Sequence, residues 1–300
     1  MQSTSSILMI RPVKFGFNEQ TSGDNAFQVK GDEQEAATKA GKEFDAFVSL
    51  LKAEGVEVTV IEDTPEPHTP DSIFPNNWFS THQGGTLVFY PMYAPNRRQE
   101  RKPAVVEHLR KLPGIRRVVD LTEYESQGVF LEGTGSMVFD RDNNLVYACR
   151  SPRTNEEVLE RFCDELDFDY YLFDAVDAGG NPIYHTNVMM SVCSGFVVAC
   201  LDSVRDLDQR ANFIELAEES DKEIVEISMD QMAEFAGNML EVRSSKGEPL
   251  LIMSARARKS LTQKQAEQLE KYCKIVSPDL TTIENNGGGS ARCMIAELFI

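Results

Sequence analysis

The sequence predicts an α/β fold: a five-fold pseudosymmetric propeller of ββαβ units closed into a ring. Five similar segments recur along the chain, each opening with a polar residue that runs into an apolar stretch. The openings lie 48 to 55 residues apart, at Asn77, Glu132, His185, Asn238 and Asn286. A repeat of this length indicates an array of supersecondary units. The last unit stops without a helix, and the first 55 residues contain a strand and a helix that would complete it.

The beginning of the chain predicts a strand, a helix, a second strand and a loop. Residues 6–10 alternate weakly between apolar and polar side chains, and residues 33–54 place apolar side chains on one helical face. Gly55 ends that helix, and the β-branched residues 56–61 predict a strand. Four prolines break residues 65–75 into a loop.

Each of the next four units predicts a hairpin followed by a helix. The hairpins are expected at residues 78–90, 135–149, 188–201 and 239–254. The helices are expected at residues 97–109, 155–166, 211–219 and 262–272, and residues 293–299 form the shortened fifth unit as a strand. A solenoid of stacked units is the competing arrangement, but it needs capping repeats at both ends and leaves the missing last helix unexplained. We therefore expect one closed domain over residues 1–300.

The composition excludes several classes of binding partner. A formal charge of −18 and a pI near 4.7 argue against nucleic acid or an anionic membrane as partner, because either would be repelled at long range. The six cysteines show no CxxC spacing, so neither a zinc site nor a disulfide framework is predicted. Reduced thiols are typical of the cytoplasm, where we expect the protein.

The amino terminus predicts a strand rather than a signal peptide, because no cationic segment precedes its short apolar stretch. No apolar run has the length of a membrane span. The expected partner is therefore a small molecule, and the sequence leaves open whether the chain forms a homodimer.

Closing the ring would bring three reactive side chains together. Cys293, His185 and Glu132 are far apart in the chain, yet each lies at or near a unit opening. They form a nucleophile, a base and an orienting carboxylate. Three glycines, residues 287–289, lie just before Cys293 and would make a poor core strand, which favours a catalytic thiol over a buried structural one. Core packing remains the expectation for the other five cysteines.

Each of these roles has a specific chemical basis. A cysteine must be a thiolate to attack a carbon that carries nitrogens, and backbone N–H groups of residues 287–290 with a protonated His185 would favour that form. His185 would protonate the leaving amine and then activate water. Glu132 would accept hydrogen bonds from substrate nitrogens and favour the imidazolium. The competing interpretations are a structural histidine and a solvated turn carboxylate.

No cofactor is predicted. The glycine run before Cys293 lacks the Lys-Ser/Thr ending and the long following helix of a nucleotide-binding loop. Histidines and acidic residues do not cluster at metal-ligand spacing, so no metal is expected either.

Several motifs, in order and over nearly the whole chain, resemble the pentein superfamily of guanidino-group-modifying enzymes. Residues 70–77 (PDSIFPNN), 94–98 (APNRR), 131–133 (LEG) and 152–155 (PRTN) resemble dimethylarginine dimethylaminohydrolase. The ending GGGSARCMIAE and residues 184–188 (YHTNV) resemble an amidinotransferase-like or citrulline-utilisation hydrolase branch. The resemblance implies a five-unit ring, a catalytic Cys293, and an amino-acid substrate.

The same resemblance implies roles for further residues. Arg97 and Arg153 match the family's clamp for the substrate carboxylate, where a planar guanidinium binds two oxygens. Helix-start arginines at the surface are the alternative interpretation. Asp71 matches a contact to the substrate's amino group.

Two departures from the family pattern favour a neutral substrate group. Relatives usually carry an acid where this chain has Asn76-Asn77, and many carry another where it has Asn187. Exchanging carboxylates for amides weakens the attraction for a guanidinium, since charge-assisted hydrogen bonds are about twice as strong as neutral ones. An amide offers both a donor and an acceptor, which suits a ureido group.

The sequence therefore predicts a cysteine hydrolase that converts a citrulline-like amino acid to ornithine, ammonia and carbon dioxide. The alternatives within the same chemistry are a deiminase or dimethylaminohydrolase acting on an arginine derivative and an amidinotransferase, which needs an acceptor amine. A ring that only binds an amino acid or a protein is the non-enzymatic alternative, and it would need no nucleophile.

Overall fold

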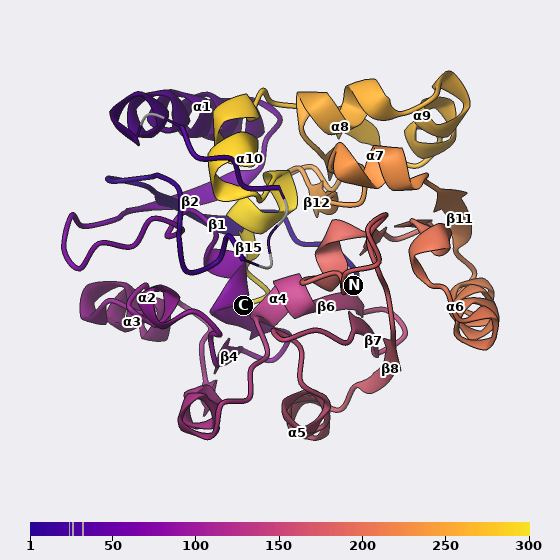
Figure 1. Ribbon diagram of the computed structural model, residues 1–300, viewed down its shortest axis with the longest axis horizontal. Coiled ribbons are helices and arrows are strands. Elements are labelled where there is room, and N and C mark those ends of the chain that lie inside the picture. The colour runs from indigo at the N-terminus through magenta and orange to yellow at the C-terminus, as the bar shows by residue number, and fades with distance from the viewer. Residues whose placement is uncertain (24, 26, 32) are drawn as a thin grey trace.

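The computed structural model describes residues 1–23, 25, 27–31 and 33–300 and contains five small β-sheets arranged as a propeller. Figure 1 shows the strands and short turns near the centre and most of the longer helices at the rim. This is the predicted five-fold α/β ring, the pentein fold. Among the described helices, none combines the length and apolarity that crossing a bilayer requires.

Every sheet has three strands with the same pairing. The first strand runs antiparallel to the middle one, and the third runs parallel to it. The sheets are β15 (Ala296–Glu297), β1 (Ser6–Arg11) and β2 (Glu57–Glu62); β3 (Phe79–His82), β4 (Thr86–Phe89) and β5 (Arg117–Asp120); β6 (Met137–Asp140), β7 (Leu145–Cys149) and β8 (Asp169–Phe173); β9 (Met190–Val192), β10 (Phe196–Ala199) and β11 (Glu223–Glu226); β12 (Leu240–Arg243), β13 (Pro249–Ile252) and β14 (Lys274–Val276).

Helices connect the second and third strands of each sheet, since parallel neighbours need a crossover. The α-helices are α1 (Glu33–Ala53), α2 (Pro95–Arg98), α3 (Pro103–Arg110), α4 (Gly133–Ser136), α5 (Glu156–Leu166), α6 (Leu207–Glu219), α7 (Met229–Ala233), α8 (Ala255–Ser260), α9 (Gln263–Glu270) and α10 (Thr281–Gly287). The 3-10 helices are η1 (Pro75–Asn77), η2 (Thr122–Gln127), η3 (Thr186–Val188), η4 (Leu201–Ser203) and η5 (Ala291–Met294).

The two ends of the chain complete one sheet together, as the repeat predicted. β15 pairs with β1 through Ile7 opposite Glu297 and Leu8 opposite Ala296, and β1 continues the sheet to β2. Helix α1 is the crossover between β1 and β2. The carboxyl-terminal segment therefore supplies β15 to this unit, and the amino-terminal segment supplies β1, α1 and β2. The predicted face of α1 is confirmed, since Ala40, Phe44 and Phe47 are fully buried.

Two predicted elements differ from the structure, and one helix was not predicted. The helix expected over 97–109 is divided into α2 and α3, because Pro103 has no N–H for a continuous helix and starts a new one. The strand expected over 293–299 shortens to β15, and Cys293 lies in η5 before it. The residues before the glycine run form α10, which no sequence pattern predicted.

Candidate active site

One-turn helices place polar side chains at the same end of four first strands. Helices η1, α4, η3 and η5 lead directly into β3, β6, β9 and β15. Asn77 ends η1, Glu132 precedes α4, His185 precedes η3 and Cys293 lies within η5. Because first strands of neighbouring sheets contact one another around the ring, these turns meet near its centre.

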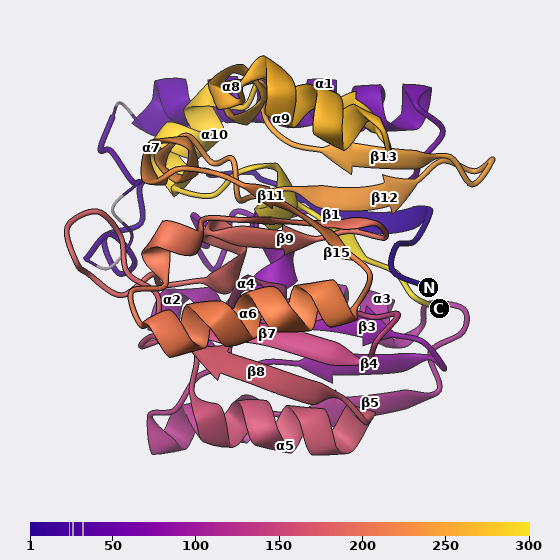
Figure 2. The same ribbon diagram turned by 90° about the vertical axis from the view of Figure 1, so that its right-hand side faces the viewer.

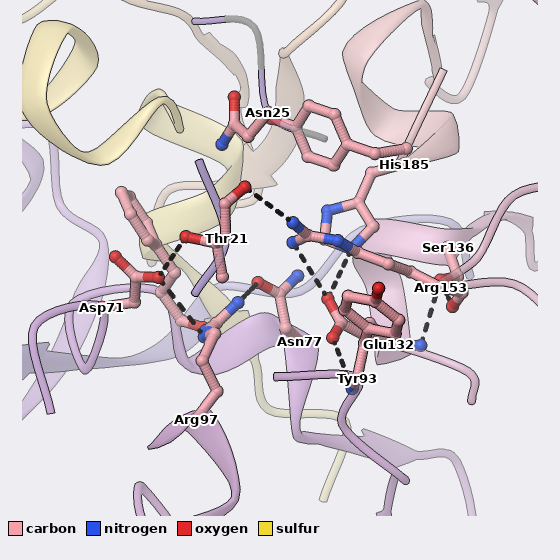
Figure 3. Close-up of polar contacts among 12 residues, drawn as sticks. Thr21, Asn25, Asp71, Asn77, Tyr93, Arg97, Glu132, Ser136, Arg153 and His185 are labelled. Carbon is pink, nitrogen blue, oxygen red and sulfur yellow. Dashed lines mark hydrogen bonds and ion pairs between the residues drawn. The ribbon is translucent and has the colours of Figure 1, made fainter. Parts of the chain in front are cut away.

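The turns line a small cavity that leaves about 20 Å³ for the centre of a water-sized guest. Its lining includes both members of the predicted reactive pair, Cys293 and His185, and four predicted substrate contacts, Asp71, Asn77, Arg97 and Arg153. Glu132 lies behind His185 (Figure 3). Asn187 contacts the Cys293 sulfur, while both side-chain polar atoms of Asn76 are buried without a described partner.

His185 is held by Glu132 in a defined orientation. The two side chains are 2.8 Å apart between Nε2 and Oε2, and both are buried. A carboxylate accepts hydrogen bonds, so Nε2 carries the ring proton and Nδ1 is left as an acceptor. Burial lowers the pKa of His185 below its usual value, although Glu132 opposes the shift. At neutral pH the ring is therefore neutral, in contrast to the protonated ring expected from sequence.

Glu132 is kept ionised by the groups around it. Its Oε1 accepts from the backbone N–H of Tyr93 at 2.9 Å, and Arg153 Nη1 lies 3.5 Å from its Oε2. Burial alone would raise the pKa of this carboxyl, but the Arg153 charge and the hydrogen bond from His185 hold the pKa well below its usual range. The carboxylate is therefore a fixed acceptor for the imidazole.

This arrangement predicts the acid limb of the pH profile of kcat/KM. His185 must be neutral to accept a proton, and its lowered pKa means that it stays neutral from pH 8 down to below its usual pKa of about 6.5. We therefore expect kcat/KM to stay constant as the pH falls from 8 to about 6.5 and to decrease only at lower pH. Measuring kcat/KM from pH 4.5 to 9 tests this, and a midpoint at or above 7 would contradict it.

Two asparagine side chains contact the sulfur of Cys293. Nδ2 of Asn238 lies 3.3 Å from Sγ, and Nδ2 of Asn187 lies 3.7 Å away. Asn238 is fixed in this orientation because its Oδ1 accepts from the backbone N–H of Arg292 at 3.1 Å. Asn238 was not predicted as a site residue, although its position at a unit opening was the available signal.

The glycines before Cys293 are required by close packing. A Cβ added at Gly287 or Gly289 would lie 2.8 or 2.9 Å from the ring of Phe74. Gly288 has a φ of +64°, and a Cβ there would lie 2.5 Å from the Asn25 side chain. The run therefore lets the chain pass between Phe74 and the segment before α1.

The two predicted clamp arginines differ in how they are held. Arg97 donates to both oxygens of Glu100, at 2.8 and 3.0 Å, to Asn77 Oδ1 at 2.7 Å and to the Phe74 carbonyl at 3.1 Å. These contacts use four of its five N–H groups. Arg153 lies 5.0 Å from the Tyr184 ring centroid and donates to the Thr21 carbonyl at 3.3 Å. Figure 3 shows both guanidinium groups beside the cavity.

The described residues between β1 and α1 cover the site, which the sequence did not predict. Asn18 donates to Asp71 at 2.7 Å, and Asn25 donates to the Gly288 carbonyl at 3.3 Å. Gln28 donates to the Gly287 carbonyl at 2.9 Å. These amides therefore tie the covering segment to both Asp71 and the glycine run.

Within the described ranges, no group of three or more histidine, cysteine or acidic side chains could hold a metal ion. All six cysteines are buried and none forms a disulfide. The arrangement contains the parts of nucleophilic catalysis: a buried thiol with two amide donors and a neutral imidazole oriented by a carboxylate.

The ring and these side chains define a class: a pentein with a cysteine, a histidine and a glutamate at one end of its axis. Within that class, the chain belongs to the family described as N,N dimethylarginine dimethylhydrolase, eukaryotic, whose profile matches residues 11–300. A comparison with curated protein sequences gives no significant match.

Solved structures with the same fold include arginine-processing proteins. The N-terminal domain of ArgZ, an arginine dihydrolase from the ornithine-ammonia cycle in cyanobacteria, matches in a cysteine-to-serine variant bound to substrate, with a TM-score of 0.76 and 18% identity. That match covers 98% of this chain and 99% of the ArgZ domain. A cysteine-to-alanine variant of AgrE with L-arginine matches with a TM-score of 0.76 and 17% identity, over 97% of this chain and 40% of AgrE.

A variant of dimethylarginine dimethylaminohydrolase, as an adduct with S-methyl-L-thiocitrulline, matches with a TM-score of 0.67 and 17% identity. The alignment covers 99% of this chain and 100% of that enzyme. At these identities the likeness shows the shared fold.

Proposed function

We propose that the chain is a cysteine hydrolase that cleaves the terminal C–N bonds of citrulline, giving ornithine, ammonia and carbon dioxide. Cys293 is the nucleophile, His185 the general acid and base, and Glu132 the group that orients the histidine. The single observation that carries the choice of substrate is the orientation of the Asn77 amide.

Arg97 fixes the orientation of the Asn77 amide. Its Nη1 donates to the Asn77 side chain at 2.7 Å, so the atom that it meets must be the oxygen. The Asn77 NH2 group is then left buried without a partner among the described residues, beside the cavity that it lines. This donor suits the carbonyl oxygen of a ureido group. A guanidinium has only donors, so neither its N–H group nor the Asn77 NH2 group would find an acceptor there.

The other predicted contacts fit the remaining parts of citrulline. Asn187 directs Nδ2 to the Cys293 sulfur, and its buried Oδ1 has no described partner, so it can accept from a ureido NH2 group. Arg153 lines the cavity, and its planar guanidinium can bind both oxygens of the substrate carboxylate. Asp71 Oδ1, buried and without a described partner, is suited to the α-ammonium.

The chemistry proceeds in two displacements. His185 Nδ1 takes the thiol proton, and the Cys293 sulfur attacks the ureido carbon. That proton then leaves with ammonia, and the rest of the substrate stays bound to the sulfur as a thiocarbamate. Water then gives a proton to His185 and attacks the same carbon. The sulfur departs and regains that proton, and the released carbamate decomposes to carbon dioxide and ornithine. One water is consumed for each citrulline.

Arginine or a methylated arginine is the second candidate. The unpartnered Asp71 oxygen favours it, since a buried carboxylate can bind a guanidinium. The family description and the arginine dihydrolase structure also support it. The same sulfur would displace ammonia or a methylamine from the guanidinium carbon, and water would release citrulline. An amidinotransferase would need an acceptor amine in place of water.

Product analysis tests the proposal. Purified protein is incubated separately with L-citrulline, L-arginine and N-methylated arginines, and ornithine, citrulline and ammonia are quantified, with Cys293→Ala as the control. Ornithine and ammonia from citrulline, absent with the variant, are the expected result. Citrulline formed from an arginine derivative would retain the mechanism and replace the substrate. No turnover of any of these substrates would favour a binding ring.

Asn77→Asp is expected to weaken the use of citrulline selectively. The change keeps the shape and the contact to Arg97 but replaces the buried NH2 donor with a carboxylate oxygen, which repels a carbonyl. We expect kcat/KM for citrulline to fall by at least about tenfold while kcat/KM for arginine falls less or rises. Equal losses for both substrates would show that Asn77 does not distinguish them.

A further inference from the structure

A second cavity lies between the first strands of the ring. Its lining comes from four of these strands and includes Gln2, Arg141, Ser191, Arg292 and Glu297. Figure 2 shows both chain termini at one end of the ring, away from the covering segment before α1. The cavity leaves about 20 Å³ for the centre of a water-sized guest, which is room for one small molecule or ion.

The charges around this cavity do not balance. Arg292 pairs with Glu297 at 3.0 Å and donates to the Ile295 carbonyl at 2.9 Å. Arg141 is 8% exposed and forms no ion pair with any described carboxylate. Two guanidinium groups therefore share one carboxylate, in contrast to the nearby buried pair of Lys222 and Asp140 at 3.6 Å.

Aromatic contacts hold Arg141 without neutralising it. Its guanidinium lies 4.0 Å from the ring centroid of Phe299 and 4.6 Å from that of Phe139, and Nη1 lies 3.2 Å from Nδ1 of His82. Burial lowers the pKa of Arg141, and so does the charge of Arg292, although Glu297 opposes this. A buried, uncompensated cation is costly, so a counter-ion would stabilise the folded state.

Unpartnered polar atoms also point to a guest. The Ser191 hydroxyl is buried and has no hydrogen-bond partner in the described structure. It lines the same cavity and can donate to an anion. A lone water would satisfy this hydroxyl but would leave the extra positive charge uncompensated.

We propose that this cavity binds one monovalent anion of the size of chloride, held by Arg141 and Arg292 with the Ser191 hydroxyl as a further donor. Its volume has room for one halide ion. Asn187, which contacts the Cys293 sulfur, also lines this cavity, so the anion site adjoins the active site. The anion site does not depend on the proposed reaction.

Thermal unfolding in chloride tests the proposal. Sodium gluconate is replaced by sodium chloride at constant total sodium, so that ionic strength stays fixed while a small anion replaces a large one. Wild-type protein is expected to show a saturable rise in Tm, on the order of 2 °C or more, and Arg141→Met is expected to lose it. Arg116→Met is the matched control, because Arg116 is exposed and its loss removes the same charge. It should retain the rise.

Two outcomes would overturn the proposal: a Tm of the wild type that does not depend on the anion, or a rise that persists unchanged in Arg141→Met. Crystals of the wild type soaked in sodium bromide give a test that needs no variant. We expect an anomalous bromide peak between Arg141 and Arg292. An ordered water there without anomalous signal would show that the cavity holds only solvent.

Discussion

A Cys293→Ser protein is expected to bind citrulline and to lose turnover by at least about 10³-fold. Serine fills the same space and can still accept hydrogen bonds from Asn238 and Asn187, so the site should keep its shape. The hydroxyl is a much weaker nucleophile than a thiolate, and removing a nucleophile abolishes the steps that depend on it. Ornithine release over hours measures the loss, and calorimetry measures citrulline affinity.

Cys273→Ser is the matched control for this change. Cys273 is also a buried thiol, but it donates to the Leu269 carbonyl in the apolar core and lies outside the active-site cavity. Its serine variant should keep its turnover within about threefold. In the wild type, Cys293 should alkylate faster than the other thiols near neutral pH, and citrulline should slow that reaction. A Cys293→Ser protein with near-normal turnover would remove the thiol from the mechanism.

The repeat made the ring predictable because its signals are local. Hairpin turns, apolar alternation and helical spacing occur within each unit, and the missing helix of the last unit implied that residues 6–54 complete it. The positions of Cys293, His185 and Glu132 followed from that closure. Two observations were enough to predict these positions: the length of the repeat and the type of residue at the opening of each unit.

Helix α10 could not be predicted in the same way, because its start is stabilised from far along the chain. Glu43, on α1, accepts from the backbone N–H groups of Thr282 and Ile283 at 2.9 to 3.1 Å. The helix itself contains two asparagines and ends in glycine, which are weak helix formers. A cap supplied from 239 residues away leaves no local pattern.

The orientation of each amide was likewise outside what sequence can provide. Asn77, Asn187 and Asn238 were visible as residue types, but which atom each presents depends on its neighbours. Arg97 determines it for Asn77, and the backbone N–H of Arg292 determines it for Asn238. The substrate argument from composition, that an amide suits a ureido group, becomes specific only when the free donor is known.

Glu132→Gln is expected to reduce kcat by roughly 10³- to 10⁴-fold by moving a proton on His185. Tyr93 donates its backbone N–H to one oxygen of Glu132, so the glutamine carbonyl should remain there and its NH2 group should face the histidine. That NH2 group can only donate to Nε2. The ring proton would then lie on Nδ1, and the histidine could no longer accept the thiol proton.

Nitrogen NMR of labelled protein distinguishes this tautomer effect from general damage. The His185 ring should be protonated at Nε2 in the wild type and at Nδ1 in Glu132→Gln. Glu125→Gln is the matched control, because Glu125 also accepts a backbone N–H, that of Met92 at 2.9 Å, without contacting the histidine. It should retain activity within about threefold. A large loss in Glu132→Gln with the proton still on Nε2 would mean that Glu132 acts on the substrate directly rather than through the tautomer of His185.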